Sequence, residues 1–269
     1  MFQSSPKPPS PKPLLWMLLL LLPPLCAAQV ATPPRSYDCY RTATPINIDG
    51  KLDDRAWKSA PWTPYFIDIQ GPAQPRPRFR TRMKMLWDDD YLYIGAELEE
   101  PNIRATLTQH DSLIFHDNDF ELFLKPLSGA TGYFEFEINA LNTTWDLYLD
   151  KPYREGGKAD SSWEIPGIKT AVHLRGTLNQ GNDKDHGWSV EIAIPWSAFN
   201  SRLPVTRPEI GSQWRANFSR VEWRPGILND WHSALPGQHR EDNWVWTSQG
   251  EINMHAPDKW GYLNFRDSH

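Results

Sequence analysis

Hydrophobic and polar residues alternate along most of the chain, which is the pattern of β-strands. In residues 91–98, Leu92, Ile94, Ala96 and Leu98 fall on one side of an extended backbone. The same period of two runs through residues 79–87, 120–124, 134–139, 145–150, 188–194 and 214–219. Because successive side chains of a strand point to opposite faces, this pattern predicts strands with one hydrophobic and one polar face.

Turn-forming residues separate these segments, at residues 87–90, 128–129, 156–157, 181–182 and 225–226. Only short helical turns are indicated. Asp53 can cap one that runs to Trp57, and Pro195 can open another that runs to Phe199. Many alternating strands with few helices predict an all-β fold, an antiparallel β-sandwich with short helical turns. Its outer face is expected to be polar and wet, and available to a ligand.

The segment from residue 221 to residue 260 lacks clean alternation and is rich in Trp, Asn, His and Gly. It is predicted to be a long aromatic-rich loop near the C-terminus. Long loops held on a rigid scaffold are more often functional than structural.

The N-terminus resembles a secretory signal peptide over residues 1–28. Lys7 and Lys12 precede a nine-residue apolar run at 14–22, which is too short to span a bilayer, and small residues precede Gln29. Export makes the protein secreted, periplasmic or attached to the cell surface. Lipid anchoring through Cys26 is disfavoured because Leu25 stands where a small residue is expected. Residues 29–45 are expected to be a Pro-rich leader, and residues 46–269 one domain.

Composition narrows the function classes. The formal net charge of -5 argues against a nucleic-acid or anionic-membrane partner, since both require a basic surface. After cleavage Cys39 is the one remaining cysteine, so the core, or a bound ion, must hold the fold. The 14 Trp residues exceed what a core of this size needs, which indicates that some are exposed stacking surfaces.

Several motifs together resemble carbohydrate-binding modules of family 9. The matching segments, in order, are IDGKLDD at 48–54, LWDDDYLY at 86–93, DNDFELF at 117–123, WSVEIAIPW at 188–196 and WGYLNF at 260–265. The resemblance runs from about Pro45 to Phe265. It implies a jelly-roll-like sandwich that binds oligo- or polysaccharides, calcium ions that stabilise the fold, and frequent attachment to a glycoside hydrolase. It implies no catalytic residues.

Members of that family hold a sugar between two Trp rings, with polar side chains around it. By motif, the resemblance places the first aromatic residue near Phe115, an acidic ligand at Glu121 and an Asn ligand at Asn139. The family's Arg ligand falls on Glu137 and its second Trp near Met254, so this sequence departs from the pattern at both positions. A rebuilt clamp is expected to use tryptophans of the late loop: Trp231, Trp244 and Trp246.

The residue types fit sugar chemistry, because an aromatic face covers the C–H side of a pyranose and planar polar groups bind its hydroxyls. Arg220 and Arg240 can bind hydroxyls, although surface ion pairing explains them as well. Asp88, Asp89 and Asp90 offer oxygen ligands for calcium, and a turn explains them equally.

Three other functions stay open at this point. Glu135 and Glu137 on one strand face allow a glycoside-hydrolase-type enzyme, but the sequence shows no apolar surround for a catalytic pair. A protein-binding surface module would also explain the excess of Trp. A haem-binding sandwich would use Met83, Met85, Met254 or His255.

Overall fold

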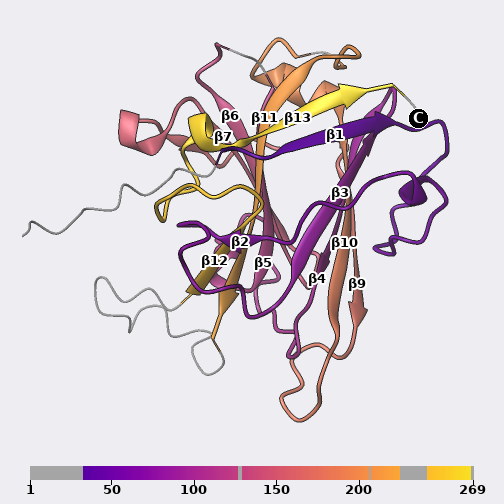
Figure 1. The fold of residues 1–269 in the computed structure, drawn as a ribbon, viewed down its shortest axis with the longest axis vertical. Coiled ribbons are helices and arrows are strands. Elements are labelled where there is room, and N and C mark those ends of the chain that lie inside the picture. The colour runs from indigo at the N-terminus through magenta and orange to yellow at the C-terminus, as the bar shows by residue number, and fades with distance from the viewer. Residues whose placement is uncertain (1–32, 127–128, 206, 225–240, 268–269) are drawn as a thin grey trace, which may run out of the picture. The chain divides into compact units, whose positions relative to one another are not determined.

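A computed structural model of the protein describes residues 33–126, 129–205, 207–224 and 241–267 (Figure 1). Within these residues the chain forms thirteen strands and short 3-10 turns, so the predicted all-β class is confirmed. The strands are β1 (Ser36–Arg41), β2 (Ile67–Asp68), β3 (Thr81–Trp87), β4 (Tyr91–Leu98), β5 (Asp119–Lys125), β6 (Tyr133–Asn139), β7 (Thr144–Leu149), β8 (Ala159–Asp160), β9 (Lys169–Arg175), β10 (Gly187–Pro195), β11 (Gln213–Trp223), β12 (Glu241–Val245) and β13 (Gly261–Arg266). The 3-10 turns are η1 (Ala56–Lys58), η2 (Ile114–His116), η3 (Tyr153–Glu155), η4 (Trp196–Ser201) and η6 (Pro257–Lys259).

The strands form one curled sheet in the order β8-β7-β6-β5-β11-β13-β1-β3-β4-β10-β9, and β12 joins β11 to β2. All these pairings are antiparallel except the two that β1 makes, with β13 and with β3. Figure 1 shows β13 and β1 crossing from the half of the sheet around β11 to the half around β3. The curl brings the two halves face to face, which gives the expected sandwich.

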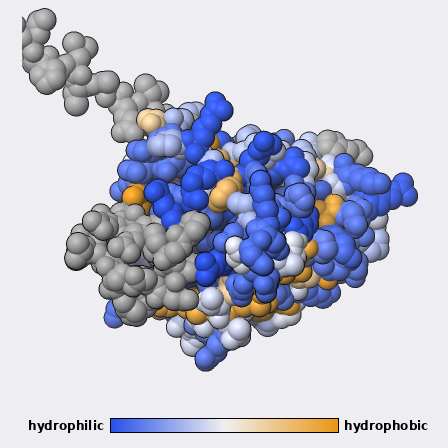
Figure 2. All heavy atoms as spheres, turned by 90° about the horizontal axis from the view of Figure 1, so that it is seen from below, coloured by the Kyte–Doolittle hydropathy of each residue, from blue (hydrophilic) through white to orange (hydrophobic). Residues whose placement is uncertain are grey.

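The main hydrophobic core lies between these halves. It contains the alternating residues that the sequence predicted, such as Leu92 and Ile94 of β4 and Phe120 and Leu122 of β5. Each such large apolar side chain contributes about 1.5–3 kcal/mol when fully buried. Most hydrophobic residues are thereby removed from the surface, and the face in Figure 2 is largely hydrophilic.

Part of the expected Pro-rich leader belongs to the sheet. Residues 36–41 form β1, which contributes Tyr37 and the fully buried Cys39 to the main core. The leader was predicted from its prolines, and this was wrong for residues 36–41 because the prolines lie outside the strand. The expected signal peptide, residues 1–28, lies outside the described residues.

A buried carboxylate explains why the sequence begins its motif with Asp49-Gly50. Glu191 on β10 accepts hydrogen bonds from the backbone N–H groups of Asp49 and Gly50 at 2.9 and 2.8 Å, and from Trp57 Nε1 at 2.6 Å. Gly50 has φ +84, and a Cβ there would lie 2.6 Å from the backbone of His173. The predicted cap by Asp53 is wrong, because η1 begins after Arg55 without a side-chain cap.

Candidate functional site

Four carboxylates line the second face of β5 and β6, which is the face turned away from the main core. Asp119 and Glu121 come from β5, and Glu135 and Glu137 come from β6, where Glu121 stands directly opposite Glu137. Their side-chain positions follow from the strand period of two. The prediction that this face is wet is wrong, because all four residues are buried.

The cover of this face comes from distant segments. Ile69, Met254 and Trp260 pack there with Phe123, Tyr133 and Val245 in a second hydrophobic cluster. The alternation within one strand carries no information about such long-range packing.

Only some of the carboxylate oxygens have hydrogen-bond donors. Ser219 Oγ donates to Glu121, the backbone N–H of Val221 donates to Asp119 at 2.9 Å, and that of Phe115 donates to Glu137 at 2.9 Å. Asp119 Oδ2 and Glu135 Oε2 are buried without a hydrogen-bond partner. Such groups are rare in folded proteins, and a bound ligand, ion or water is a common reason for them.

Burial raises the pKa of all four carboxyl groups. The pKa of Glu121 rises to about 7, and burial is the main cause. For Glu135 and Glu137 burial also comes first, and the charge of Glu121 adds to it. The expectation that no carboxylate pair here has an environment that raises its pKa is therefore wrong.

Aromatic rings stand at both ends of this row of acids. At the Glu137 end, the half-buried rings of Phe115 and Trp145 lie 6.1 Å apart, and Trp145 is the direct neighbour of Glu137 on β7. The indole N–H of Trp145 is buried without an acceptor. At the other end, Tyr153 is 45% exposed and its ring lies 4.5 Å from that of His255. We call the four carboxylates together with Phe115, Trp145 and Tyr153 the acidic face.

The acidic face includes two of the residues chosen from the sequence, Phe115 and Glu121, and it also includes Glu137. Trp145 and Tyr153 were missed. Trp145 alternates with Leu147 and Leu149 and looked like a core residue, and Tyr153 stands alone in a turn. The packing of Tyr153 on His255, which itself lies 4.0 Å from Glu135, is visible only in three dimensions.

Asn139 lies on the same face, but other parts of the chain use its side chain. Its amide N–H groups donate to Leu107 O at 2.8 Å and to Asp117 Oδ2 at 3.0 Å, and its oxygen accepts from the backbone of Leu141 and Thr143. Asn139 therefore holds the β6–β7 turn, and a direct contact with sugar stays a prediction.

The late tryptophans are placed differently from what we expected. Trp244 is 3% exposed and Trp246 is fully buried, so neither is an exposed stacking surface. Both belong to the main core, where Trp244 packs edge-on against Phe79 and Trp246 against Phe218. Trp231 and Arg240 lie outside the described residues. Residues 241–245 of the expected loop form β12, which pairs with β11.

The other residues considered as haem or calcium ligands take part in packing, in a turn or in ion pairs. Met83 and Met85 are core residues, and Met254 packs in the second cluster. Asp88 accepts hydrogen bonds from the backbone of Asp90 and Tyr91, both at 2.8 Å, so it forms the β3–β4 turn. Asp89 pairs with Arg41 and Arg207.

Two groups of described residues can offer several ligand atoms to a metal ion. Oxygens of Asp119, Glu121 and Glu137 lie within 4.8 Å of one another on the acidic face. The other group contains His110, Asp146 and Glu164. A structural calcium ion stays a prediction, and the oxygen-only set of the acidic face is of the type that calcium accepts.

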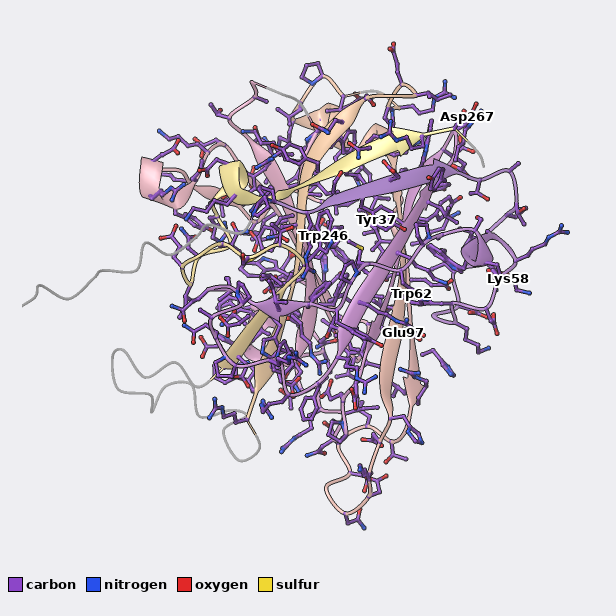
Figure 3. All side chains as sticks on the ribbon, in the orientation of Figure 1. Tyr37, Lys58, Trp62, Glu97, Trp246 and Asp267 are labelled. Atoms are coloured by element: carbon purple, nitrogen blue, oxygen red, sulfur yellow. The ribbon has the colours of Figure 1, made fainter. Side chains whose placement is uncertain are left out.

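A groove of about 460 Å³ lies on the outer face of β3 and β4. Tyr65, Arg80 and Arg82 line it together with Glu97, which receives two hydrogen bonds from Arg82. Trp62 covers Arg82, with the guanidinium 4.0 Å from the ring centre, and Figure 3 labels Trp62 and Glu97 in this region. Two of its arginines are paired, Arg82 with Glu97 and Arg80 with Glu99. Among the described residues, no helix has the length and apolarity that crossing a membrane requires.

Comparison with known proteins defines the class. The family model "Carbohydrate family 9 binding domain-like" matches residues 48–267. A family 9 carbohydrate-binding module from Caldicellulosiruptor kristjanssonii, solved with cellotriose, aligns over 87% of this chain and 95% of its own, with a TM-score of 0.57 and 17% identity. The same organism's module solved with glucose aligns over 86% and 97%, with a TM-score of 0.55 and 17% identity. A solved Bacteroides uniformis protein reaches a TM-score of 0.64 at 16% identity, over 86% of this chain and 99% of its own.

Two curated relatives are much longer. Exoglucanase XynX of Acetivibrio thermocellus is 26% identical over 58% of this chain and 12% of its own length. Endo-1,4-beta-xylanase A of Thermoanaerobacterium saccharolyticum is 25% identical over 58% of this chain and 11% of its own. The matched region is thus about an eighth of each relative.

Fold and comparisons define a β-sandwich of the carbohydrate-binding-module class. The chain belongs to the carbohydrate family 9 binding domain-like family, as its sequence motifs indicated. That family is one of binding domains and not of catalytic domains.

Proposed function

We propose that this chain binds carbohydrate on the acidic face. The observation that carries the proposal is that unpartnered hydrogen-bonding groups lie between aromatic rings on one face, in a member of this family. The unpartnered groups are the indole N–H of Trp145, Asp119 Oδ2 and Glu135 Oε2. A pyranose ring can pack on the half-buried rings of Phe115 and Trp145, and its hydroxyls would bond these donors and acceptors once the side chains that cover them move aside.

The charge of the acidic face limits the kind of sugar. Four carboxylates gather there, and Glu137 stands where the resemblance places an Arg. Burial raises the pKa of these groups, and those that are ionised would repel an anionic sugar, which disfavours uronic acids and sulfated glycans. The ligand is therefore a neutral glycan or an amino sugar, whose ammonium group would also offset the buried charge.

Calorimetric titration with cellotriose, xylotriose, a glucosamine trimer and a galacturonate trimer tests this proposal. We expect binding of a neutral or amino-sugar trimer and none of the galacturonate trimer. Trp145→Ala and Glu121→Gln should each weaken binding at least tenfold, because each removes a central contact of the site, and about 1.4 kcal/mol corresponds to tenfold. Tyr65→Ala is the control, since it removes an exposed aromatic ring that lies in the β3–β4 groove.

Equal affinity in the parent and Trp145→Ala, with loss in Tyr65→Ala, would move the site to the β3–β4 groove. Failure of every trimer to bind would contradict carbohydrate binding itself. Comparing cellotriose with its borohydride-reduced form also shows whether a reducing end is required, because reduction opens only the terminal ring.

We further propose that the protein is exported and acts beside a polysaccharide hydrolase. The signal-like N-terminus and the relatives named as an exoglucanase and a xylanase support this. N-terminal sequencing of the protein recovered from outside the cytoplasm should begin at Gln29. An intact Met1 in that fraction would contradict cleavage at this position.

A further inference from the structure

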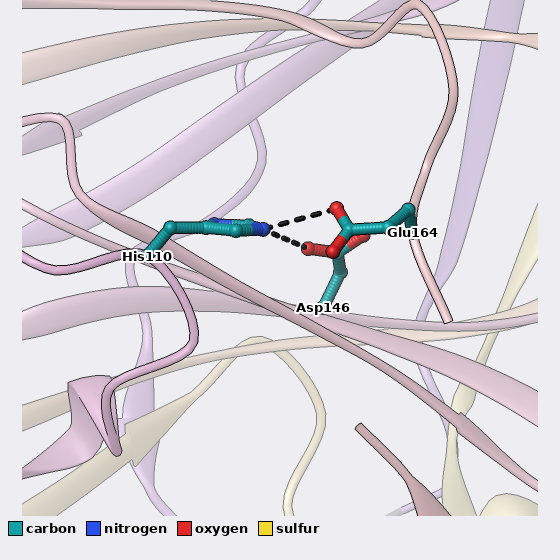
Figure 4. Close-up of side chains that lie close together, drawn as sticks. All are labelled: His110, Asp146 and Glu164. Carbon is teal, nitrogen blue, oxygen red and sulfur yellow. Dashed lines mark hydrogen bonds and ion pairs between the residues drawn. The ribbon is translucent and has the colours of Figure 1, made fainter. Parts of the chain in front are cut away.

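A second group of possible metal ligands comes from the loop before η2, from β7 and from the segment after β8. His110 Nε2 lies 3.0 Å from Glu164 Oε2, 3.4 Å from Asp111 Oδ1 and 3.6 Å from Asp146 Oδ1. Figure 4 shows the imidazole edge directed between the carboxylates of Asp146 and Glu164. We propose that these four side chains bind a divalent transition-metal ion of the Zn²⁺ type.

The spacing of the ligand atoms fits one small ion. In a tetrahedral zinc site with bonds of about 2.0–2.1 Å, neighbouring ligand atoms are about 3.3 Å apart. The three distances from His110 Nε2 bracket this value. The ligand atoms of His110, Asp146 and Glu164 also lie within 4.8 Å of one another. Small side-chain rotations are therefore enough to close the site around an ion.

The hydrogen bonds of His110 hold its ring with Nε2 directed at the carboxylates, where it lies 3.0 Å from Glu164 Oε2. His110 Nδ1 lies 2.9 Å from the backbone carbonyl oxygen of Thr144. A carbonyl oxygen can only accept, so Nδ1 carries a proton, and a metal ion that displaces the proton between Nε2 and Glu164 would meet the Nε2 lone pair. A metal-bound histidine usually has its second nitrogen held in this way.

Asp146 directs a second carboxylate oxygen into the group from the body of the sheet. It is 3% exposed, and one carboxylate oxygen, Oδ2, accepts a hydrogen bond from the backbone N–H of Ile165 at 2.5 Å. The other oxygen, Oδ1, points to His110 and accepts no hydrogen bond from the described residues. A cation bound between His110 and Asp146 would pair with this oxygen, while the backbone N–H of Ile165 keeps the other one in place.

The group also holds more negative than positive side chains. In the described part of the chain, no Lys or Arg pairs with Asp111, Asp146 or Glu164, whose ion-pair partner is His110. A neutral His110 leaves three negative charges there, and a dication offsets two of them. The imidazole ligand favours zinc or a neighbouring transition metal over calcium, because calcium takes oxygen ligands.

Such an ion would join three separate segments. Asp111 and His110 precede η2, which carries Phe115, and Asp146 lies on β7. Glu164 lies between Trp163 and Ile165, both of which are anchored in the main core. The metal would therefore fix the loop before η2 to the body of the sandwich.

Titration of the metal-free, EDTA-dialysed protein with ZnCl₂ tests the proposal by calorimetry and thermal unfolding. We expect one ion per chain and a higher unfolding midpoint in the presence of zinc, since an ion that binds only the folded state stabilises it. His110→Ala and Asp146→Asn should each weaken zinc binding at least tenfold. Glu164→Gln, at an exposed position that folding tolerates, should do the same.

His186→Ala is the matched control, because it removes another exposed imidazole that lies outside the group. Its zinc affinity should equal that of the parent. Absence of stoichiometric binding by the parent would overturn the proposal, and so would unchanged affinity in both His110→Ala and Glu164→Gln. Calcium binding as tight as zinc binding, lost in Glu164→Gln, would overturn the assignment to a transition metal.

Discussion

At the scale of single residues, Arg220 shows most clearly how this protein accommodates a buried charge. Surface ion pairing was the expectation, but Arg220 is fully buried on the core side of β11. It donates to Glu222 at 2.6 Å and to the backbone carbonyl of Glu99 at 2.8 Å, and it lies 3.4 Å from Glu100. The expectation is wrong because two buried carboxylates and a carbonyl offset the loss of hydration.

Replacing Arg220 therefore tests how buried charges are balanced. Arg220→Met should lower the free energy of unfolding by about 3–5 kcal/mol, because it leaves Glu100 and Glu222 buried without a cation. Urea denaturation measures this loss. Arg82→Met removes a partly exposed pair with Glu97 and should cost less than about 1 kcal/mol. Similar losses in the two variants would contradict the special role of burial.

At the scale of the strands, the acidic face links pH to stability. Its carboxyl groups have a higher pKa in the folded protein than in the unfolded chain, so the folded state holds more protons. The free energy of unfolding should then fall as the pH rises from about 4.5, the ordinary value for Glu, through about 7, the pKa of Glu121. A shift of this size corresponds to at most about 3 kcal/mol for one group.

Glu137→Gln should reduce this pH dependence and make the protein more stable than the parent at pH 8. The substitution removes one negative charge next to Glu121 but keeps an oxygen for the backbone N–H of Phe115. Urea denaturation between pH 5 and pH 8 in the presence of EDTA measures the effect. Glu97→Gln makes the same charge change at a partly exposed site. An unaltered pH profile in Glu137→Gln would show that the acids are not coupled through this face.

The strands also show what sequence can and cannot predict. Alternation located β3, β4, β5, β6, β10 and the start of β11, because each has one side in the main core, and it located β7 because Leu147 and Leu149 pack in the second cluster. It missed β9, whose residues are mostly half-buried, and β12, which is short and lies within a polar segment. The burial of Glu121 and Glu137 was not predictable, since the cover comes from residues as distant as Ile69 and Trp260.

The candidate site was predicted only in part for a related reason. Phe115 and Glu121 followed from motif positions that the family shares. Trp145 looked like a core residue because a strand's own pattern cannot show which of two faces is the main core. The roles of Trp244 and Trp246 were misjudged because an excess of tryptophan does not show which of them the core absorbs.

At the scale of the molecule, the described strands form a continuous network in which β1 occupies the middle. β1 connects the half that carries the acidic face to the half that carries Glu191, through parallel pairing with β13 and β3. Cys39 of β1 is fully buried, and burial raises the pKa of its thiol. Reaction of this thiol with a reagent therefore reports when the middle of the sheet opens.

If the sheet unfolds as one unit, a remote destabilisation should expose Cys39 to the same extent as the whole protein. Glu191 on β10 accepts hydrogen bonds from three N–H groups through its two carboxylate oxygens. Glu191→Gln replaces one of these oxygens with an NH₂ donor, which should lower the free energy of unfolding by about 1–3 kcal/mol. In a Cys26→Ser background, the rate of Cys39 labelling should rise by the same factor as the unfolding constant from urea denaturation. A labelling rate that does not change would mean that β1 opens by itself. Its parallel pairings with β13 and β3 would then be a weak connection between two halves that are stable separately.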